Sequence, residues 1–172
     1  MQPEHALPDH AHLLQQLRAA FPPEPTRAAG AFADWGMTYL DVEPYSQHLE
    51  GESWEDLDRS YLIKRYDALG FLGTRHLIAV LPVYLRSLID EGLWSPAAGT
   101  VIIILTKPGP AQKTGIKLPR FQALVDALTP AQRAVIAAVL RAFAASDEGG
   151  SPGRAASAAI ESYWKTYLPD GS

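Results

Sequence analysis

RHLIAVLPVYLRSLID, residues 75–90, is apolar on nearly every side of the helix that its spacing predicts. A surface helix keeps one polar face, so a helix of this composition belongs in the middle of a core. It is too short and too closely flanked by charged residues to cross a bilayer. Pro82 removes one backbone hydrogen bond, which predicts a kink near Ile78. Arg86 and Asp90 are four residues apart and can form an ion pair on this helix.

The size and composition of the chain indicate one globular domain without staples. A chain of 172 residues can bury about 70% of its unfolded surface, so it needs no metal or disulfide for stability. It contains no cysteine, which excludes disulfides and thiolate chemistry and fits a reducing compartment. No basic segment followed by an apolar run marks the N-terminus as a secretory signal, so we expect a cytoplasmic protein. We expect no cofactor.

Charge is unevenly distributed along the chain. The net charge of −4 argues against nucleic acid as a partner, because nucleic-acid binding depends on clustered Lys and Arg. Residues 28–58 contain no Lys or Arg and eight acids: Asp34, Asp41, Glu43, Glu50, Glu52, Glu55, Asp56 and Asp58. Residues 92–125 contain no acid and four bases: Lys107, Lys113, Lys117 and Arg120. Both segments fit solvated faces, and the first also fits a face that binds a basic partner.

The pattern of apolar residues predicts a mainly α, compact single-domain bundle of six or seven helices. The apolar helix 75–90, kinked at Pro82, should lie at its centre. The domain should span residues 1–172, with an N-terminal tail (1–8), a flexible connector (146–153) and a C-terminal helix (154–168). The other predicted helices cover residues 10–21, 53–70, 118–128 and a segment that begins at 130.

Several residues are suited to start these helices. Asp9, Ser53 and Thr74 each precede a predicted helix and have side chains that can accept a hydrogen bond from its first turn. Thr129 followed by Pro130 is the clearest start, because proline is favoured at the first helical position.

The segment VIIIL, residues 101–105, leaves two structures open. Its β-branched residues are typical of a buried strand, for which only residues 37–42 offer a partner in a minimal two-stranded ribbon. Alternatively, packing forces VIIIL into a helix capped by Thr100, and this is the structure we favour. Residues 107–119 contain three prolines and two glycines and should form a loop.

Known catalytic and metal-binding motifs are absent from the sequence. The loop GPAQKTGIK, residues 109–117, lacks the Gly-Lys-Ser/Thr ending that a phosphate-binding P-loop requires. His48, Glu52 and Asp56 are spaced four residues apart, which would align three ligands on one helix face. Gly51 interrupts that helix, so we expect no metal site.

The order of several short motifs resembles a family of small bacterial helical domains of unknown function. The resemblance covers roughly residues 10–145. It rests on Arg18-Ala19-Ala20-Phe21-Pro22, Gly51-x-x-Trp54-x-Asp56-Leu57, Ala68-Leu69-Gly70-Phe71-Leu72, Leu81-Pro82-Val83-Tyr84-Leu85 and Leu128-Thr129-Pro130-Ala131-Gln132-Arg133. It implies a helical fold and a bacterial origin, and it implies no activity.

The acid-rich segment leads to the favoured functional hypothesis. We expect a protein-binding or regulatory module, for instance an immunity-type protein, that presents residues 41–58 to a basic protein partner and binds no membrane. The residues expected to contact the partner are Glu50, Glu52, Glu55 and Asp58.

A small hydrolase-like enzyme is the alternative hypothesis. Its catalytic candidates are Glu43, His48 and Asp56, which would have to line a common cleft. A structural subunit is a third hypothesis, and the sequence leaves the oligomeric state open.

Overall fold

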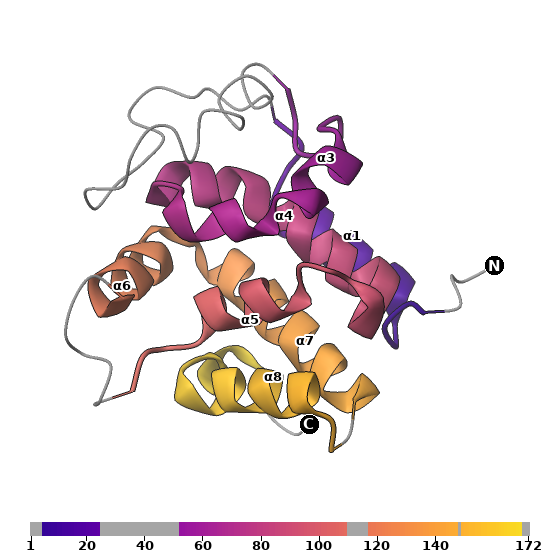
Figure 1. Ribbon diagram of the computed structural model, residues 1–172, viewed down its shortest axis with the longest axis vertical. Helices are drawn as coiled ribbons and strands as arrows, with labels where there is room; N and C mark the ends of the chain where they lie inside the picture. The colour runs from indigo at the N-terminus through magenta and orange to yellow at the C-terminus, as the bar shows by residue number, and fades with distance from the viewer. Residues whose placement is uncertain (1–4, 25–51, 110–116, 148, 170–172) are drawn as a thin grey trace.

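The computed structural model describes residues 5–24, 52–109, 117–147 and 149–169 of the chain (Figure 1). Within these ranges the secondary structure is mainly helical, which confirms the predicted fold class. The α-helices are α1 (His10–Ala20), α3 (Arg59–Lys64), α4 (Thr74–Glu91), α5 (Ala98–Leu105), α6 (Lys117–Ala127), α7 (Pro130–Ser146) and α8 (Ser151–Ser162). Shorter 3₁₀ helices are η2 (Tyr66–Phe71), η3 (Gly92–Trp94) and η5 (Trp164–Tyr167).

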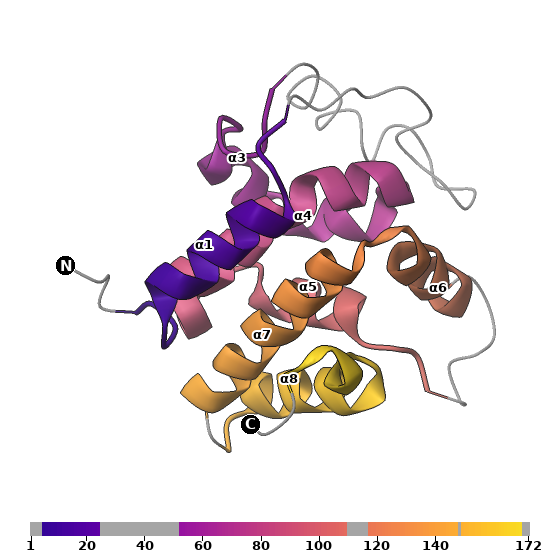
Figure 2. The same cartoon turned by 180° about the vertical axis from the view of Figure 1, so that it is seen from behind.

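Helix α4 lies at the centre of the core, as its composition predicts. It contacts α1, α3, α5, α6 and α7. Five of its apolar side chains have no measurable exposure to solvent: Val80, Tyr84, Leu85, Leu88 and Ile89. The helix continues from Thr74 to Glu91 with Pro82 inside it. Figure 2 shows α1 and α7, two of the helices that cover α4, lying side by side.

The C-terminal end of α4 is closed by Gly92 and by residues before α1. Gly92 has a φ of 53°, and a Cβ atom there would lie 2.7 Å from the carbonyl oxygen of His5, so only glycine fits. Leu7 is 1% exposed, and its backbone N–H donates to the carbonyl of Ile89 at 2.9 Å. Leu7, inside the predicted N-terminal tail, is therefore packed against the end of α4. A single apolar side chain with helix-end carbonyls nearby is enough to fix this segment.

The segment before α4 forms two short helices in place of the predicted helix 53–70. Asp58, not Ser53, caps α3, because its carboxylate accepts a hydrogen bond from the backbone N–H of Tyr61. Ser53 is buried and donates instead to the carboxylate of Asp56 at 2.6 Å. Helix α3 ends at Lys64, and the 3₁₀ helix η2 begins at Tyr66. Asp is a favoured N-cap residue, and several acids follow one another in this segment, so the sequence alone does not define where α3 begins.

The VIIIL segment is helical and lies in α5, which Figure 1 shows between α4 and α8. Val101, Ile102 and Leu105 are buried, while Ile103 is 73% exposed. Burial of each large apolar side chain is worth about 1.5–3 kcal/mol, more than the helix-propensity cost of about 0.7 kcal/mol or less per β-branched residue. The helix starts before Thr100, so that predicted cap is wrong.

Two further predicted caps are also wrong in detail. Asp9 precedes α1 but has a left-handed backbone conformation and makes no side-chain capping hydrogen bond. Thr74 is the first residue of α4, and Gly73 occupies the cap position. By contrast, Thr129 caps α7 through a complete capping box with Gln132, as predicted for this start.

The C-terminal region differs from its predicted boundaries. Helix α8 begins at Ser151, inside the predicted connector 146–153, with Pro152 in its first turn. It ends at Ser162, and η5 then replaces the last turn of the predicted helix 154–168. Trp164 is fully buried and its Nε1 donates to the carbonyl of Leu105 at 2.6 Å, which ties η5 to the end of α5.

Residues 37–42, the proposed partner strand, lie outside the described residues. No single helix in the described ranges has the length and apolarity needed to cross a membrane; α6 and α7 meet that measure only together, across a bend of 117°.

Replacing Tyr84 with Phe should destabilise the fold by about 0.5–1.5 kcal/mol, because the carbonyl of Leu62 would lose one buried donor and keep the backbone N–H of Arg65. The Tyr84 hydroxyl donates to that carbonyl at 2.7 Å. Urea unfolding followed by circular dichroism measures the change. The matched control is Tyr66→Phe, since that half-buried hydroxyl makes no hydrogen bond among the described residues. Equal stability of the two variants would contradict a role for the Tyr84 hydroxyl.

Candidate functional site

The predicted partner-binding acids are only partly visible. Glu50 lies outside the described residues. Glu52 is exposed, and Glu55 is half-buried and accepts a hydrogen bond from Nε of Arg18 at 2.6 Å. Asp58 is exposed and caps α3. Two of these acids therefore already stabilise the fold, and Glu52 is the one whose carboxylate has no partner within the described residues.

The hydrolase hypothesis is not tested by the described part of the chain. Glu43 and His48 lie outside the described residues. Asp56 is exposed, and its carboxylate accepts the hydroxyl hydrogen bond of Ser53.

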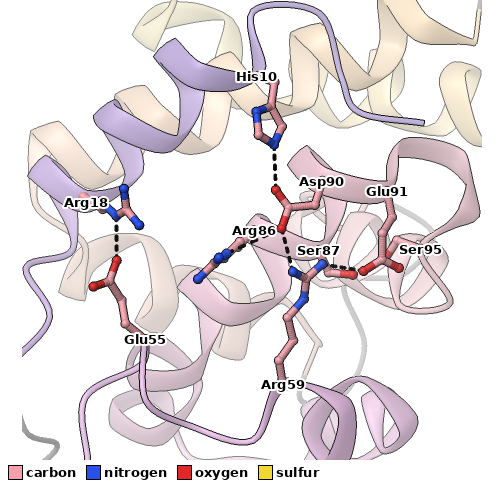
Figure 3. A network of polar contacts seen from close by, with 9 residues as sticks. All are labelled: His10, Arg18, Glu55, Arg59, Arg86, Ser87, Asp90, Glu91 and Ser95. Carbon is pink, nitrogen blue, oxygen red and sulfur yellow. Dashed lines mark hydrogen bonds and ion pairs between the residues drawn. The ribbon is translucent and has the colours of Figure 1, made fainter. Parts of the chain in front are cut away.

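A polar network joins three helices at the C-terminal end of α4 (Figure 3). One oxygen of the Asp90 carboxylate accepts a hydrogen bond from Nε2 of His10 at 2.8 Å. The other oxygen accepts one from Arg59 at 2.6 Å. Arg59 also pairs with Glu91, and Nε of Arg86 lies 3.4 Å from Asp90, which confirms the predicted Arg86–Asp90 pair. These side chains pair with one another, and we interpret the network as one that holds α1, α3 and α4 together.

A larger opening lies between the other end of α4 and helices α5, α6 and α8. This cavity has a volume of about 570 Å³, within the range of about 300–1,000 Å³ found for small-molecule sites. Its walls are mainly aliphatic, with one aromatic ring, and come from segments distant in sequence: Leu72, Leu77, Ile102, Ile103, Ile104, Phe121, Leu124, Ala155 and Ala158. We call it the α5–α6 cavity.

The polar lining of the α5–α6 cavity is sparse and carries positive charge. Lys117 is exposed at the start of α6, and Arg120 follows one turn later. The Arg120 guanidinium donates to the carbonyl of Gly70 and, at 3.2 Å, to that of Leu72, which fixes it against η2. The hydroxyl of Thr106 donates to the carbonyl of Ile102 at 2.7 Å. No Asp or Glu lines the cavity among the described residues.

A smaller cavity of about 290 Å³ lies on another side of α4. Phe21, Trp54 and Pro82 form its apolar wall, and Glu24 and Gln132 add polar groups. Nε1 of Trp54 is already satisfied, because it donates to the carbonyl of Phe21 at 2.8 Å.

An aromatic cluster supports the α6 wall of the larger cavity. Phe121 meets the rings of Tyr163 and Trp164 edge to face, at centroid distances of 5.2 and 6.4 Å. Burial raises the pKa of Tyr163 to about 12. The hydrogen bond from Tyr163 lowers the pKa of Tyr167, and a second one from Arg133 adds to this effect. The hydroxyls of Tyr163 and Tyr167 lie 3.2 Å apart and hydrogen-bond each other. We therefore interpret the cluster as structural.

Metal ligands do not gather in the described ranges, where no group of three His, Asp or Glu side chains could hold an ion. Three histidines near the N-terminus have separate contacts. His5 packs against Trp94, His10 binds Asp90, and His12 hydrogen-bonds Gln16.

Comparison with known proteins places the chain in a family without assigning its activity. Residues 11–168 match a family of unknown function, DUF6714, and the chain belongs to that family. This agrees with the resemblance to an uncharacterised family. Searches of curated proteins and of solved structures find no match to this chain.

The sequence alone does not reveal the α5–α6 cavity. Its walls come from four helices and η2, and no local spacing links them. One signal was present, the acid-free segment 92–125, which contributes α5, Lys117 and Arg120 to the site.

Replacing Asp90 with Asn should lower the free energy of unfolding by about 1–3 kcal/mol, because charged hydrogen bonds to His10 and Arg59 are lost in a partly buried setting. Asp90 is 15% exposed. The matched control is Glu161→Gln, which breaks an exposed pair with Lys165 and should cost less than about 0.5 kcal/mol. Urea unfolding of both variants measures the difference, and equal losses would show that the network does not hold these helices together.

Proposed function

We propose that this protein binds a small apolar molecule in the α5–α6 cavity. The observation that carries the proposal is the cavity itself: about 570 Å³ with walls that are almost wholly apolar. Apolar surface left open to water is unfavourable, and filling it is worth about 25 cal/mol per Å². Ile103, Ala155 and Ala158 are exposed wall residues, and a ligand that covers them gains binding free energy.

The small side chains of α8 support this proposal. Ala155 and Ala158 face the cavity, whereas larger residues at these positions would fill it. Both alanines are exposed, so the opening is accessible from solvent. Trp164 and Phe121 hold the opposite wall in place through the aromatic cluster. The site is thus preorganised by packed helices, which reduces the entropy lost on binding.

Ala158→Phe should weaken binding of the neutral fluorophore N-phenyl-1-naphthylamine by at least about tenfold, because the ring occupies ligand volume. Fluorescence titration measures the dissociation constant. The matched control is Ala145→Phe on α7, an exposed alanine that does not line the cavity. Its affinity should match that of the unchanged protein. Absence of probe binding to the unchanged protein, or equal weakening by both substitutions, would refute the proposed site.

A second proposal is that residues 41–58 bind a basic protein. It is supported by the exposed acids Glu52, Asp56 and Asp58, which lie close together in the chain. Glu52 is the most informative position. Within the described residues its carboxylate has no partner, so a substitution there removes no known contact of the fold.

Reversing the charges of Glu50, Glu52, Glu55 and Asp58 to Lys should abolish capture of a basic protein partner. Mass spectrometry of proteins retained by the immobilised chain measures capture. Glu52→Lys alone should reduce capture without loss of stability, which separates a surface effect from unfolding. Reversal of Asp126 and Glu161, exposed acids on α6 and α8, is the control. Unchanged capture by the fourfold variant would reject this second proposal.

A further inference from the structure

We propose that the ligand of the α5–α6 cavity is a single-chain amphiphile with an anionic head, such as a long-chain carboxylate. The inference rests on the proposed function and adds the chemical class of the ligand. The hydrocarbon chain would lie against the aliphatic walls, and the head would lie at the mouth beside Lys117 and Arg120.

Charge at the cavity selects the sign of the head. Lys117 and Arg120 are the charged side chains that line the cavity among the described residues. Lys117 is exposed, and within the described residues its ammonium group makes no ion pair. The guanidinium of Arg120 donates to the carbonyls of Gly70 and Leu72, which places its positive charge at the mouth. An anionic head would therefore gain charge-assisted contacts there, and a cationic head would be repelled.

Two acids on helices that line the cavity have partners elsewhere. Asp126, on α6, accepts a hydrogen bond from Gln122 at 2.7 Å and does not line the cavity. Glu161, on α8, pairs with Lys165 at 3.0 Å. The positive charge at the mouth is therefore not cancelled by a carboxylate of the cavity lining.

The walls favour a hydrocarbon chain over a peptide. A peptide carries backbone N–H and C=O groups, and each one costs free energy when it is buried without a partner. The α5 wall offers mainly Ile102, Ile103 and Ile104, and the hydroxyl of Thr106 is already bonded to a backbone carbonyl. A hydrocarbon chain needs no partners, so it fits these walls without that cost.

Competition among three ligands with the same chain and different heads tests the inference. Hexadecanoate, hexadecanol and hexadecyltrimethylammonium, each below its aggregation concentration, should displace N-phenyl-1-naphthylamine from the full-length protein. We expect hexadecanoate to act at a concentration at least about tenfold below that of the alcohol, with the ammonium compound weakest. High salt should reduce the preference for hexadecanoate.

Lys117→Gln should weaken binding of hexadecanoate more than binding of hexadecanol, so that the preference for hexadecanoate falls several-fold. Lys117 is exposed, so this change should not impair folding. The matched control is Lys165→Gln, an exposed lysine outside the cavity lining, which should leave the preference unchanged.

The outcomes separate the inference from the proposed function. Probe binding with equal displacement by all three ligands would overturn the anionic head and leave the apolar site intact. No probe binding at all would overturn both. Displacement by an apolar peptide and by none of the three amphiphiles would show a peptide site. A dimer that dissociates on Ala158→Phe, measured by analytical ultracentrifugation, would assign the cavity to a second copy of the chain and also overturn the inference.

Discussion

Burial of α4 is the constraint on which the rest of this structure depends. Its side chains are apolar on nearly every side, so the free energy of folding favours any arrangement that surrounds it with other helices. Pro82 costs about 3 kcal/mol or more in a helix interior. Each buried large aliphatic residue contributes about 1.5–3 kcal/mol, so Val80, Leu85 and Leu88 together outweigh that cost. The helix therefore tolerates its proline because packing, not local propensity, holds it.

The two ends of α4 differ in their surroundings. At the C-terminal end, the carboxylate of Asp90 already accepts hydrogen bonds from His10 of α1 and Arg59 of α3. At the N-terminal end, Leu77 faces a cavity that α5, α6 and α8 surround without filling. A ligand at the Asp90 end would have to displace ion pairs before it gained anything. The lining of the cavity is mainly apolar, which is why we propose binding at that end.

The sequence predicts the centre of the fold better than its edges. The apolar periodicity of residues 75–90 and the Thr129–Pro130 start are strong local signals, and both are confirmed. The start of α3 was misplaced because Ser53, Asp56 and Asp58 can all cap a helix, and only tertiary contacts select Asp58. The candidate cavity could not be predicted, because it is enclosed by residues from several segments. The acid-free stretch around it was visible as a charge pattern, but its meaning depends on Lys117 and Arg120 meeting the α5 wall in space.

Helix α5 links the packing of the core to the proposed site. Val101, Ile102 and Leu105 face inward and force a β-branched segment into a helix, and this leaves Ile103 73% exposed. A helix of eight residues with one buried face cannot hide five consecutive large apolar side chains, since successive residues point about 100° apart. Some apolar surface of α5 must therefore face the cavity or solvent. Occupation of the cavity by a hydrocarbon chain would cover part of that surface. The cavity is therefore apolar for the same reason that α5 cannot bury all of its side chains: its apolar residues are consecutive, and a helix distributes them over several faces.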